Sequence, residues 1–129
     1  MIVKNIMTPV DKLIIVSQMD TIEFALKKMK EFKIKSVIVE KHGPSGAYGL
    51  LTFKNILQAI VAEDGDMELL SVYDLANTPA ISVSSKMDVK YAAKMMVNSS
   101  IKRLLVIDDN EISGIISMTD IVEVIIENT

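Results

Sequence analysis

Apolar residues follow the same order of patterns twice along the chain. Short runs rich in isoleucine and valine, at 14–16 and 81–83, predict strands. After each run, apolar residues recur every three or four positions, which indicates an amphipathic helix. The residues of these stripes are Ile22, Ala25, Leu26, Met29 and Phe32 in the first half, and Val89, Ala92, Ala93, Met96 and Val97 in the second. Each half is therefore expected to open with a strand followed by a helix.

The rest of each half repeats as well. Buried strands are predicted at 37–39 and 104–107, and after a turn two further strands end at Leu51 and Ile116. A closing helix follows, with the stripes Phe53, Ile56, Leu57, Ile60, Val61 and Met118, Ile121, Val122, Ile125, Ile126. The predicted order is strand, helix, strand, strand, helix, written twice. The acidic run 63–66, with its central glycine, is typical of a linker.

Residue identities confirm an internal repeat. The aligned pairs are Thr8-Pro9 with Thr78-Pro79, Thr21–Glu40 with Asp88–Ile107, and Gly49–Val61 with Gly114–Ile126. Six of the twenty pairs in the middle block are identical, where about one is expected by chance at average composition. The first copy is longer in two places, after Pro9 and in the glycine-rich turn 42–46, where insertion costs little.

A copy of about sixty residues is marginal as an independent domain. We therefore predict one α/β unit made of two pseudo-symmetric β-α-β-β-α repeats packed through their sheets. The predicted boundaries are 1–62 for the first domain, 63–68 for the linker and 69–129 for the second domain.

Several motifs, in the same order in both copies, resemble a tandem pair of CBS domains, the cystathionine-β-synthase-type regulatory module or Bateman module. The motifs are Met7-Thr8-Pro9 and Asn77-Thr78-Pro79, the phrases IKSVIVE and IKRLLVID, and the Gly-x-x-Ser/Thr-x-x-Asp/Asn phrases that begin at Gly49 and Gly114. The resemblance covers nearly the whole chain. One departure is that Ile38 and Leu105 stand where the family often has proline before the valine of its second strand.

The phrase Ser117-Met118-Thr119-Asp120 has a purely structural interpretation. The serine can cap the closing helix while the acidic residue three positions later reaches back to the cap's amide, as in a capping box. A carboxylate at a helix N-terminus is also favoured by the helix dipole. Stability alone could therefore account for these residues.

The same phrase also has a functional interpretation. Free amides at a helix start attract phosphate, and a hydroxyl of Ser117 or Thr119 can donate to the same group. A carboxylate one turn along can accept the two hydrogen bonds that a ribose diol donates, and these bonds are charge-assisted. The segment can thus bind a ribose and a phosphate together.

The resemblance to CBS pairs implies two clefts between the repeats that bind an adenosine-containing ligand. The stronger site would place Thr78, Ala80 and Ile81 around the base, Ile101 and Arg103 at the border, and Ser117, Thr119 and Asp120 on the sugar phosphate. The weaker site would contain Thr8, Val10, Ile34, Thr52, Lys54 and Asn55. It is expected to bind less well because Asn55 keeps an acceptor but loses the charge, although Lys54 could attract phosphate instead.

Composition narrows the choice of partners. The formal charge of −3 and the pI of about 5.1 argue against nucleic acid. The absence of cysteine excludes disulfides and thiolate metal sites. The start, MIVKNIMTPV, is not typical of a signal peptide, and the apolar runs are too short to span a bilayer. A cytoplasmic location without membrane insertion is expected.

Other candidate residues have simpler explanations. His42 lies in a glycine-rich turn without a partner for base catalysis. Asp108, Asp109 and Glu111 could suggest a metal cluster, but they fall in a turn where such residues are ordinary. The lysines Lys27, Lys28, Lys30, Lys33 and Lys35 mostly occupy the outer face of a helix, where Glu23 and Glu31 are expected to pair with Lys27 and Lys35. Arg103 is the better candidate for a phosphate.

No nucleophile–base pair, metal cluster or P-loop is present, so neither catalysis nor a cofactor is expected. The resemblance to CBS pairs implies a regulatory module that binds AMP, ADP, ATP, S-adenosylmethionine or a similar compound, forms a homodimer and acts on a separate effector protein. A ligand-free dimeric scaffold is the alternative. Ligand and effector identities stay open at this level.

Overall fold

The computed structural model describes all residues 1–129, and the chain forms two compact units. One unit is Ile14–Ala80, and the other combines Met1–Leu13 with Ile81–Thr129. The predicted domain boundaries follow the sequence repeat, whereas the compact units divide the chain elsewhere. The first thirteen residues join the unit of the second repeat, and residues 69–80 join the unit of the first.

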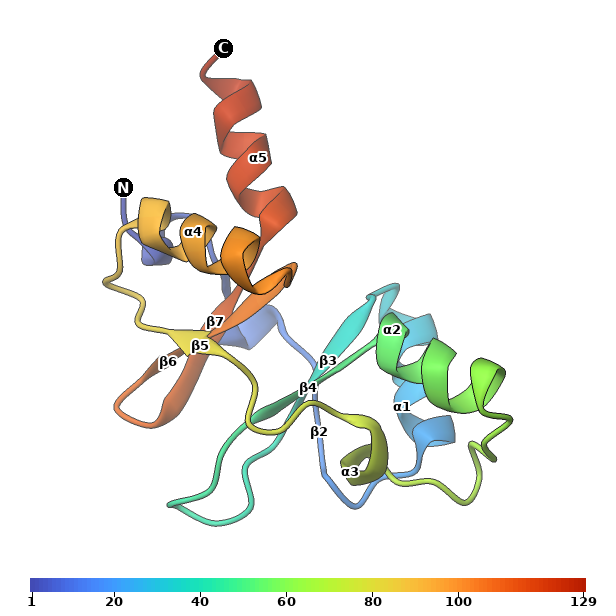
Figure 1. Cartoon of the computed structure of the whole chain (residues 1–129). Helices are drawn as coiled ribbons and strands as arrows, with labels where there is room; N and C mark the ends of the chain where they lie inside the picture. The colour runs from blue at the N-terminus through green and yellow to red at the C-terminus, as the bar shows by residue number, and fades with distance from the viewer. The chain divides into compact units, whose positions relative to one another are not determined.

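The unit 14–80 is a three-stranded sheet with helices. Its elements are β2 (Ile15–Val16), α1 (Ile22–Phe32), β3 (Ser36–Val39), β4 (Gly49–Thr52), α2 (Phe53–Ile56), the π-helical η3 (Leu57–Ala62) and α3 (Val72–Leu75). The strand order is β2-β3-β4, with β2 parallel and β4 antiparallel to β3 (Figure 1). Its core is aliphatic, with Met29 as the one buried methionine.

The other unit has a four-stranded sheet. Its elements are η1 (Val3–Asn5), β1 (Thr8–Pro9), η2 (Val10–Lys12), β5 (Ser82–Val83), α4 (Val89–Ser99), β6 (Arg103–Asp108), β7 (Glu111–Ser117) and α5 (Met118–Glu127). The strand order is β1-β7-β6-β5. The predicted α/β class and the repeated element order are thus confirmed. No helix combines the length and apolar character needed to cross a membrane.

The first helix of each repeat begins and ends in the same way. Thr21 Oγ1 accepts the amide of Phe24 at the start of α1, and Asp88 caps α4 in the equivalent position. Both helices end at a residue in the left-handed region, Lys33 and Ser100, each with φ of 54°. Local sequence therefore determines both helices, as the apolar stripes predicted.

The closing helices differ between the repeats, although their apolar stripes match in sequence. α5 is a regular α-helix of ten residues, whereas α2 has four residues and continues as the six-residue π-helix η3. The amide of Glu63 accordingly donates to the carbonyl of Gln58, five residues earlier. The position of this closing helix was predicted correctly, but its π-helical geometry was not.

Each unit completes its core with a valine from the other repeat. Val3 and Val72 are both fully buried, Val3 in the core of the second repeat and Val72 in the core of the first. The amide of Val3 donates to Met87 O and that of Val72 to Asp20 O, both at 2.8 Å. Met87 and Asp20 occupy equivalent places in the repeat, so the exchange is reciprocal. It supplies apolar contacts that a unit of this size needs.

The two Thr-Pro segments are exchanged in the same way, since each packs in the unit formed mainly by the other repeat. β1 pairs with β7 so that Thr8 lies opposite Ile115, and Leu50 bridges to Asn77 beside Thr78. A Cβ on Gly114 would collide with the carbonyl oxygen of Thr8. Glycine opens the repeated phrase because a backbone from the opposite repeat approaches it too closely for any side chain.

Candidate functional site

The start of α5 contains the predicted capping box. The amide of Ser117 donates to Asp120 Oδ2 at 2.8 Å, and the amide of Asp120 donates to Ser117 Oγ at 3.1 Å. The structural interpretation of this phrase is therefore correct. The box uses only one carboxylate oxygen, however. Asp120 Oδ1 and the hydroxyl proton of Ser117 form no hydrogen bond within the protein, so both remain available to a ligand.

At the equivalent start of α2, the side-chain oxygen of Asn55 is fully occupied by hydrogen bonds within the protein. Asn55 Oδ1 accepts from the amide of Thr52 at 2.9 Å and from Thr52 Oγ1 at 3.0 Å. Two hydrogen bonds fill the capacity of an amide oxygen, and the Thr52 hydroxyl proton is used in one of them. The side chain of Asn55 can therefore offer a ligand its Nδ2 donor but no unoccupied oxygen. Of the two residues that close the capping boxes, only Asp120 keeps an unoccupied side-chain oxygen.

Charge separates the two helix starts further. Arg103 lies opposite Ser117 in the β6–β7 pair, whereas Ser36 lies opposite Thr52 in the β3–β4 pair. An arginine is always ionised and can bind a phosphate through two parallel hydrogen bonds. The α5 start thus combines a half-buried cation with an open carboxylate oxygen. At the α2 start the cation is the exposed Lys54.

The structure distributes the predicted site residues between the two units. One unit holds Ile81, Ile101, Arg103, Ser117, Thr119 and Asp120 together with Thr8 and Val10. The other holds Ile34, Thr52, Lys54 and Asn55 together with Thr78 and Ala80. Each predicted set is therefore divided, because the Thr-Pro segments pair with the opposite repeat. Which of these residues contact a ligand stays a prediction.

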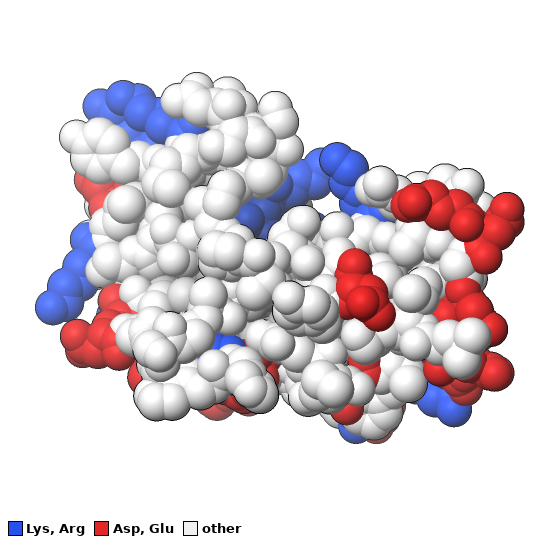
Figure 2. Space-filling view, turned by 60° about the horizontal axis from the view of Figure 1, so that its bottom comes forward, with Lys and Arg blue, Asp and Glu red and all other residues white.

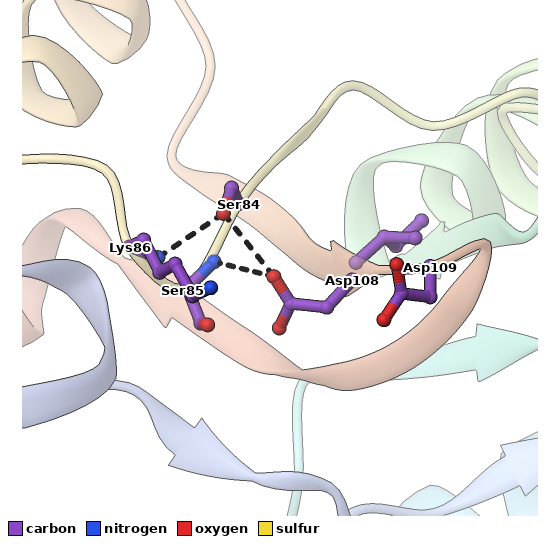
Figure 3. A pocket seen from close by; sticks show the side chains of 6 residues that line it. Ser84, Ser85, Lys86, Asp108 and Asp109 are labelled. Carbon is purple, nitrogen blue, oxygen red and sulfur yellow. Dashed lines mark hydrogen bonds between the residues drawn. The ribbon is translucent and has the colours of Figure 1, made fainter.

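The acidic turn that suggested a metal cluster contains a serine network instead. Asp108 Oδ2 accepts from Ser113 Oγ at 2.7 Å, while its Oδ1 accepts from Ser85 N at 3.1 Å and Ser84 Oγ at 3.2 Å. Asp109 and Asn110 have φ of 51° and 61°, as in a two-residue hairpin turn. Asp108 lines a hollow of about 440 Å³ (Figure 3). The hydrogen bonds of Asp108 thus connect the loop before α4 to the β6–β7 hairpin.

This network predicts acid sensitivity in the second unit. The hydrogen bond from Ser113, followed by those from Ser85 and Ser84, lowers the pKa of Asp108 from 3.8 to about 2. Because the folded pKa is depressed, the stabilisation is present above pH 3.8 and is lost as the pH falls through about 2. We expect Asp108→Asn to lower the free energy of unfolding at pH 7 by about 1 kcal/mol and to reduce its slope between those pH values. Urea titrations across this pH range would measure both, and an unchanged slope would contradict the assignment.

The structure also tests the two ion pairs predicted for the first helix and the position of His42. Glu23 and Lys27 form the expected ion pair on α1 at 3.2 Å. Glu31 and Lys35 do not pair, because α1 ends at Phe32 and Lys35 lies beyond the helical spacing that would bring them together. His42 is exposed in its loop.

Comparison with known proteins identifies the family. The CBS domain model matches residues 3–62 and 72–127. The chain belongs to the CBS domain family and carries two copies of the domain.

Relatives of known sequence support this assignment. The uncharacterized protein MK0525 of Methanopyrus kandleri is 34% identical over 100 residues, which are 75% of this chain and 50% of MK0525. The CBS domain-containing protein YhcV of Bacillus subtilis is 28% identical over 106 residues, covering 82% of this chain and 74% of YhcV. The chain thus spans half the length of the first of these relatives.

Solved structures share the fold. A hexameric CBS-CP12 protein from bloom-forming cyanobacteria superposes with a TM-score of 0.88 at 29% identity, covering 95% of this chain and 71% of that one. CBSX2 from Arabidopsis thaliana, solved in complex with AMP, has a TM-score of 0.83 at 19% identity and covers 98% and 97% of the two chains. At that identity the second likeness concerns the fold alone.

Proposed function

We propose that this chain is a non-catalytic regulatory module that binds an adenosine-containing ligand and passes the signal to a separate effector protein. The observation that carries the proposal is the open oxygen of Asp120 at the same helix start as the free hydroxyl of Ser117, with Arg103 opposite Ser117 in the β6–β7 pair. An acceptor and a donor thus lie at one helix start, and the residue opposite the cap is a cation of phosphate-binding type.

The chemistry follows from those groups. Asp120 Oδ1 accepts from the ribose hydroxyls while Oδ2 keeps the cap closed, so binding does not unmake the helix start. Arg103 and the Ser117 hydroxyl donate to a phosphate or to another negatively charged tail. Thr78, Ala80, Ile81, Ile101 and Thr119 complete the proposed stronger site. The proposed weaker site contains Thr8, Val10, Ile34, Thr52, Lys54 and Asn55, and the side-chain oxygen of Asn55 is already occupied there.

Family membership and the AMP complex of CBSX2 support an adenosine ligand. AMP, ADP, ATP and S-adenosylmethionine share the adenosine that Asp120 would recognise. A signal requires that the ligand bind two arrangements of the protein unequally. We propose that a homodimer provides them. The exposed stripe Val122, Ile125 and Ile126 on α5 and the hexameric state of the cyanobacterial relative support self-association.

A ligand-free dimeric scaffold is the second candidate. The observation that favours it is the capping box, which is complete in the protein alone. In that case Asp120 contributes only to stability.

Thermal unfolding separates the two candidates. A ligand that binds only the folded protein must stabilise it, by about 2.7 kcal/mol at a concentration one hundred times its Kd. We expect AMP, ADP, ATP or S-adenosylmethionine to raise the Tm, with adenine alone and ribose 5-phosphate giving smaller shifts. If every adenosine compound leaves the Tm unchanged at millimolar concentration, the scaffold function is supported instead.

A further inference from the structure

One segment of the chain carries negative charge without any internal counter-charge. Residues 55–80 contain no lysine, arginine or histidine and five acidic residues, Glu63, Asp64, Asp66, Glu68 and Asp74. The segment has a charge of −5 in a chain of −3, so the remainder carries +2. None of the five carboxylates forms an ion pair, since the pair in the structure joins Glu23 to Lys27.

Large apolar side chains are exposed in the same segment and in the loop whose backbone it contacts. Leu69 is 82% exposed, Met19 79% and Tyr73 62%. Their backbones are held together in one unit. The amide of Tyr73 donates to Gln18 O at 3.0 Å, next to Met19, and the amide of Leu69 donates to Asp66 O at 3.1 Å. We call Met19, Leu69 and Tyr73, with the five acidic residues, the acidic α3 surface.

The carboxylates also brace this surface. Asp74 Oδ2 accepts from the amide and the hydroxyl of Ser71 at 2.9 and 3.0 Å, which caps α3. Asp66 Oδ1 accepts from the amide of Glu68 at 2.9 Å. Each of these two carboxylates keeps its other oxygen free, and their hydrogen bonds order the backbone around Leu69 and Tyr73. Acidic side chains are the more frequent charged groups at the right of Figure 2.

We propose that the acidic α3 surface docks a basic segment of a partner protein that also carries apolar side chains. This inference rests on the proposed function in one respect, since it takes the partner to be the effector. Lysines or arginines of the segment would supply the missing counter-charge and speed the encounter, and its apolar residues would cover Leu69, Tyr73 and Met19.

Other occupants fit less well. Nucleic acid has the wrong sign of charge. A metal ion is not favoured, because no three of the acidic side chains lie close enough together to hold one. A second copy would have to present the lysine-rich outer face of α1, where Lys27 already pairs with Glu23, and this occupant is tested below by self-association.

The test uses a labelled synthetic peptide of about sixteen residues with lysine and leucine at helical spacing, and a control peptide with glutamate in place of lysine. We expect the lysine peptide to bind the full chain at about 0.05 M NaCl and to bind at least about tenfold more weakly at about 0.5 M. Fluorescence anisotropy measures both affinities. Equal binding of the glutamate peptide, or no binding of the lysine peptide, would overturn the proposal.

Matched variants locate the binding. Glu63→Lys combined with Glu68→Lys is expected to weaken the lysine peptide about tenfold or more, whereas Glu123→Lys with Glu127→Lys on α5 makes the same change in net charge and should alter it less than about twofold. Leu69→Ser with Tyr73→Ser should likewise weaken binding, unlike Val97→Ser with Tyr91→Ser, which removes side chains of similar exposure on α4. Equal losses in test and control variants would contradict the assigned surface.

Two further readouts separate this inference from the proposed function. AMP should still raise the Tm of the Glu63→Lys, Glu68→Lys variant. If the peptide fails while AMP binds, only the docking surface is wrong; if AMP fails while the peptide binds there, only the nucleotide function is wrong. Salt-sensitive self-association that is lost in the same variant would assign the surface to a second copy and overturn the proposal.

Discussion

Replacing Asp120 by asparagine is expected to weaken AMP binding about tenfold to one hundredfold while leaving the fold intact. Asparagine can close the α5 cap through its single amide oxygen, as Asn55 does in the first repeat. The oxygen left for the ribose disappears, and with it at least one charge-assisted hydrogen bond, which contributes about 1.5 to 3 kcal/mol. Isothermal titration calorimetry on the full chain measures the change directly.

Three companion variants sharpen this experiment. Asn55→Ala should leave the stronger site unchanged. Asn55→Asp should create an open carboxylate oxygen in the first repeat and improve binding there. Asp120→Ala should also lose the hydrogen bond from the Ser117 amide to the side chain, which is one half of the capping box, so that its Tm falls in the absence of ligand while that of Asp120→Asn does not. If Asp120→Asn and Asn55→Ala reduce AMP affinity equally, the asymmetry between the two helix starts is refuted.

Gly114→Ala is expected to lower the free energy of unfolding by about 2 to 3 kcal/mol, a large effect for one methyl group. The new Cβ would collide with the carbonyl oxygen of Thr8, and a backbone atom cannot move aside as the end of a flexible side chain can. Either β7 or β1 must shift, and the Thr8–Ile115 pairing weakens. Urea unfolding followed by circular dichroism gives the change.

Gly43→Ala is the matched control. Gly43 has φ of 81° and no neighbouring atom within 4 Å of an added Cβ. Its substitution should cost only the backbone strain of a positive φ, about 1 kcal/mol. The two glycines are thus required for different reasons, one for close approach and one for conformation. A smaller loss in Gly114→Ala than in Gly43→Ala would show that the close approach of β1 does not hold the unit together.

Much of the fold could be predicted because the relevant signals are local. Thr21 and Asp88 lie immediately before the apolar stripes that they cap, and the stripes themselves give the helices α1 and α4. The capping box at Ser117 was predictable for the same reason. Its significance was not, since the free oxygen of Asp120 and the occupied oxygen of Asn55 differ only in how each side chain is bonded in three dimensions.

The features that escaped prediction depend on residues far apart in the chain. Val3 and Thr8 read as the beginning of the first repeat, yet they pack and pair in the unit of the second. The serines around Asp108 come from an element more than twenty positions earlier as well as from the adjacent strand. The contrast between Arg103 and Ser36 was already present in the aligned middle block of the repeats, but that both residues lie opposite a helix cap is visible only in the strand pairing.

The sequence by itself determined the duplicated order of elements, the capping box at the start of the last helix and the family, because periodicity, caps and motifs are read from neighbouring residues. Only the tertiary structure decided which repeat receives each Thr-Pro segment and which helix start keeps an acceptor open. Those outcomes depend on how distant surfaces fill a core and satisfy hydrogen bonds, and two nearly identical phrases leave that choice undetermined.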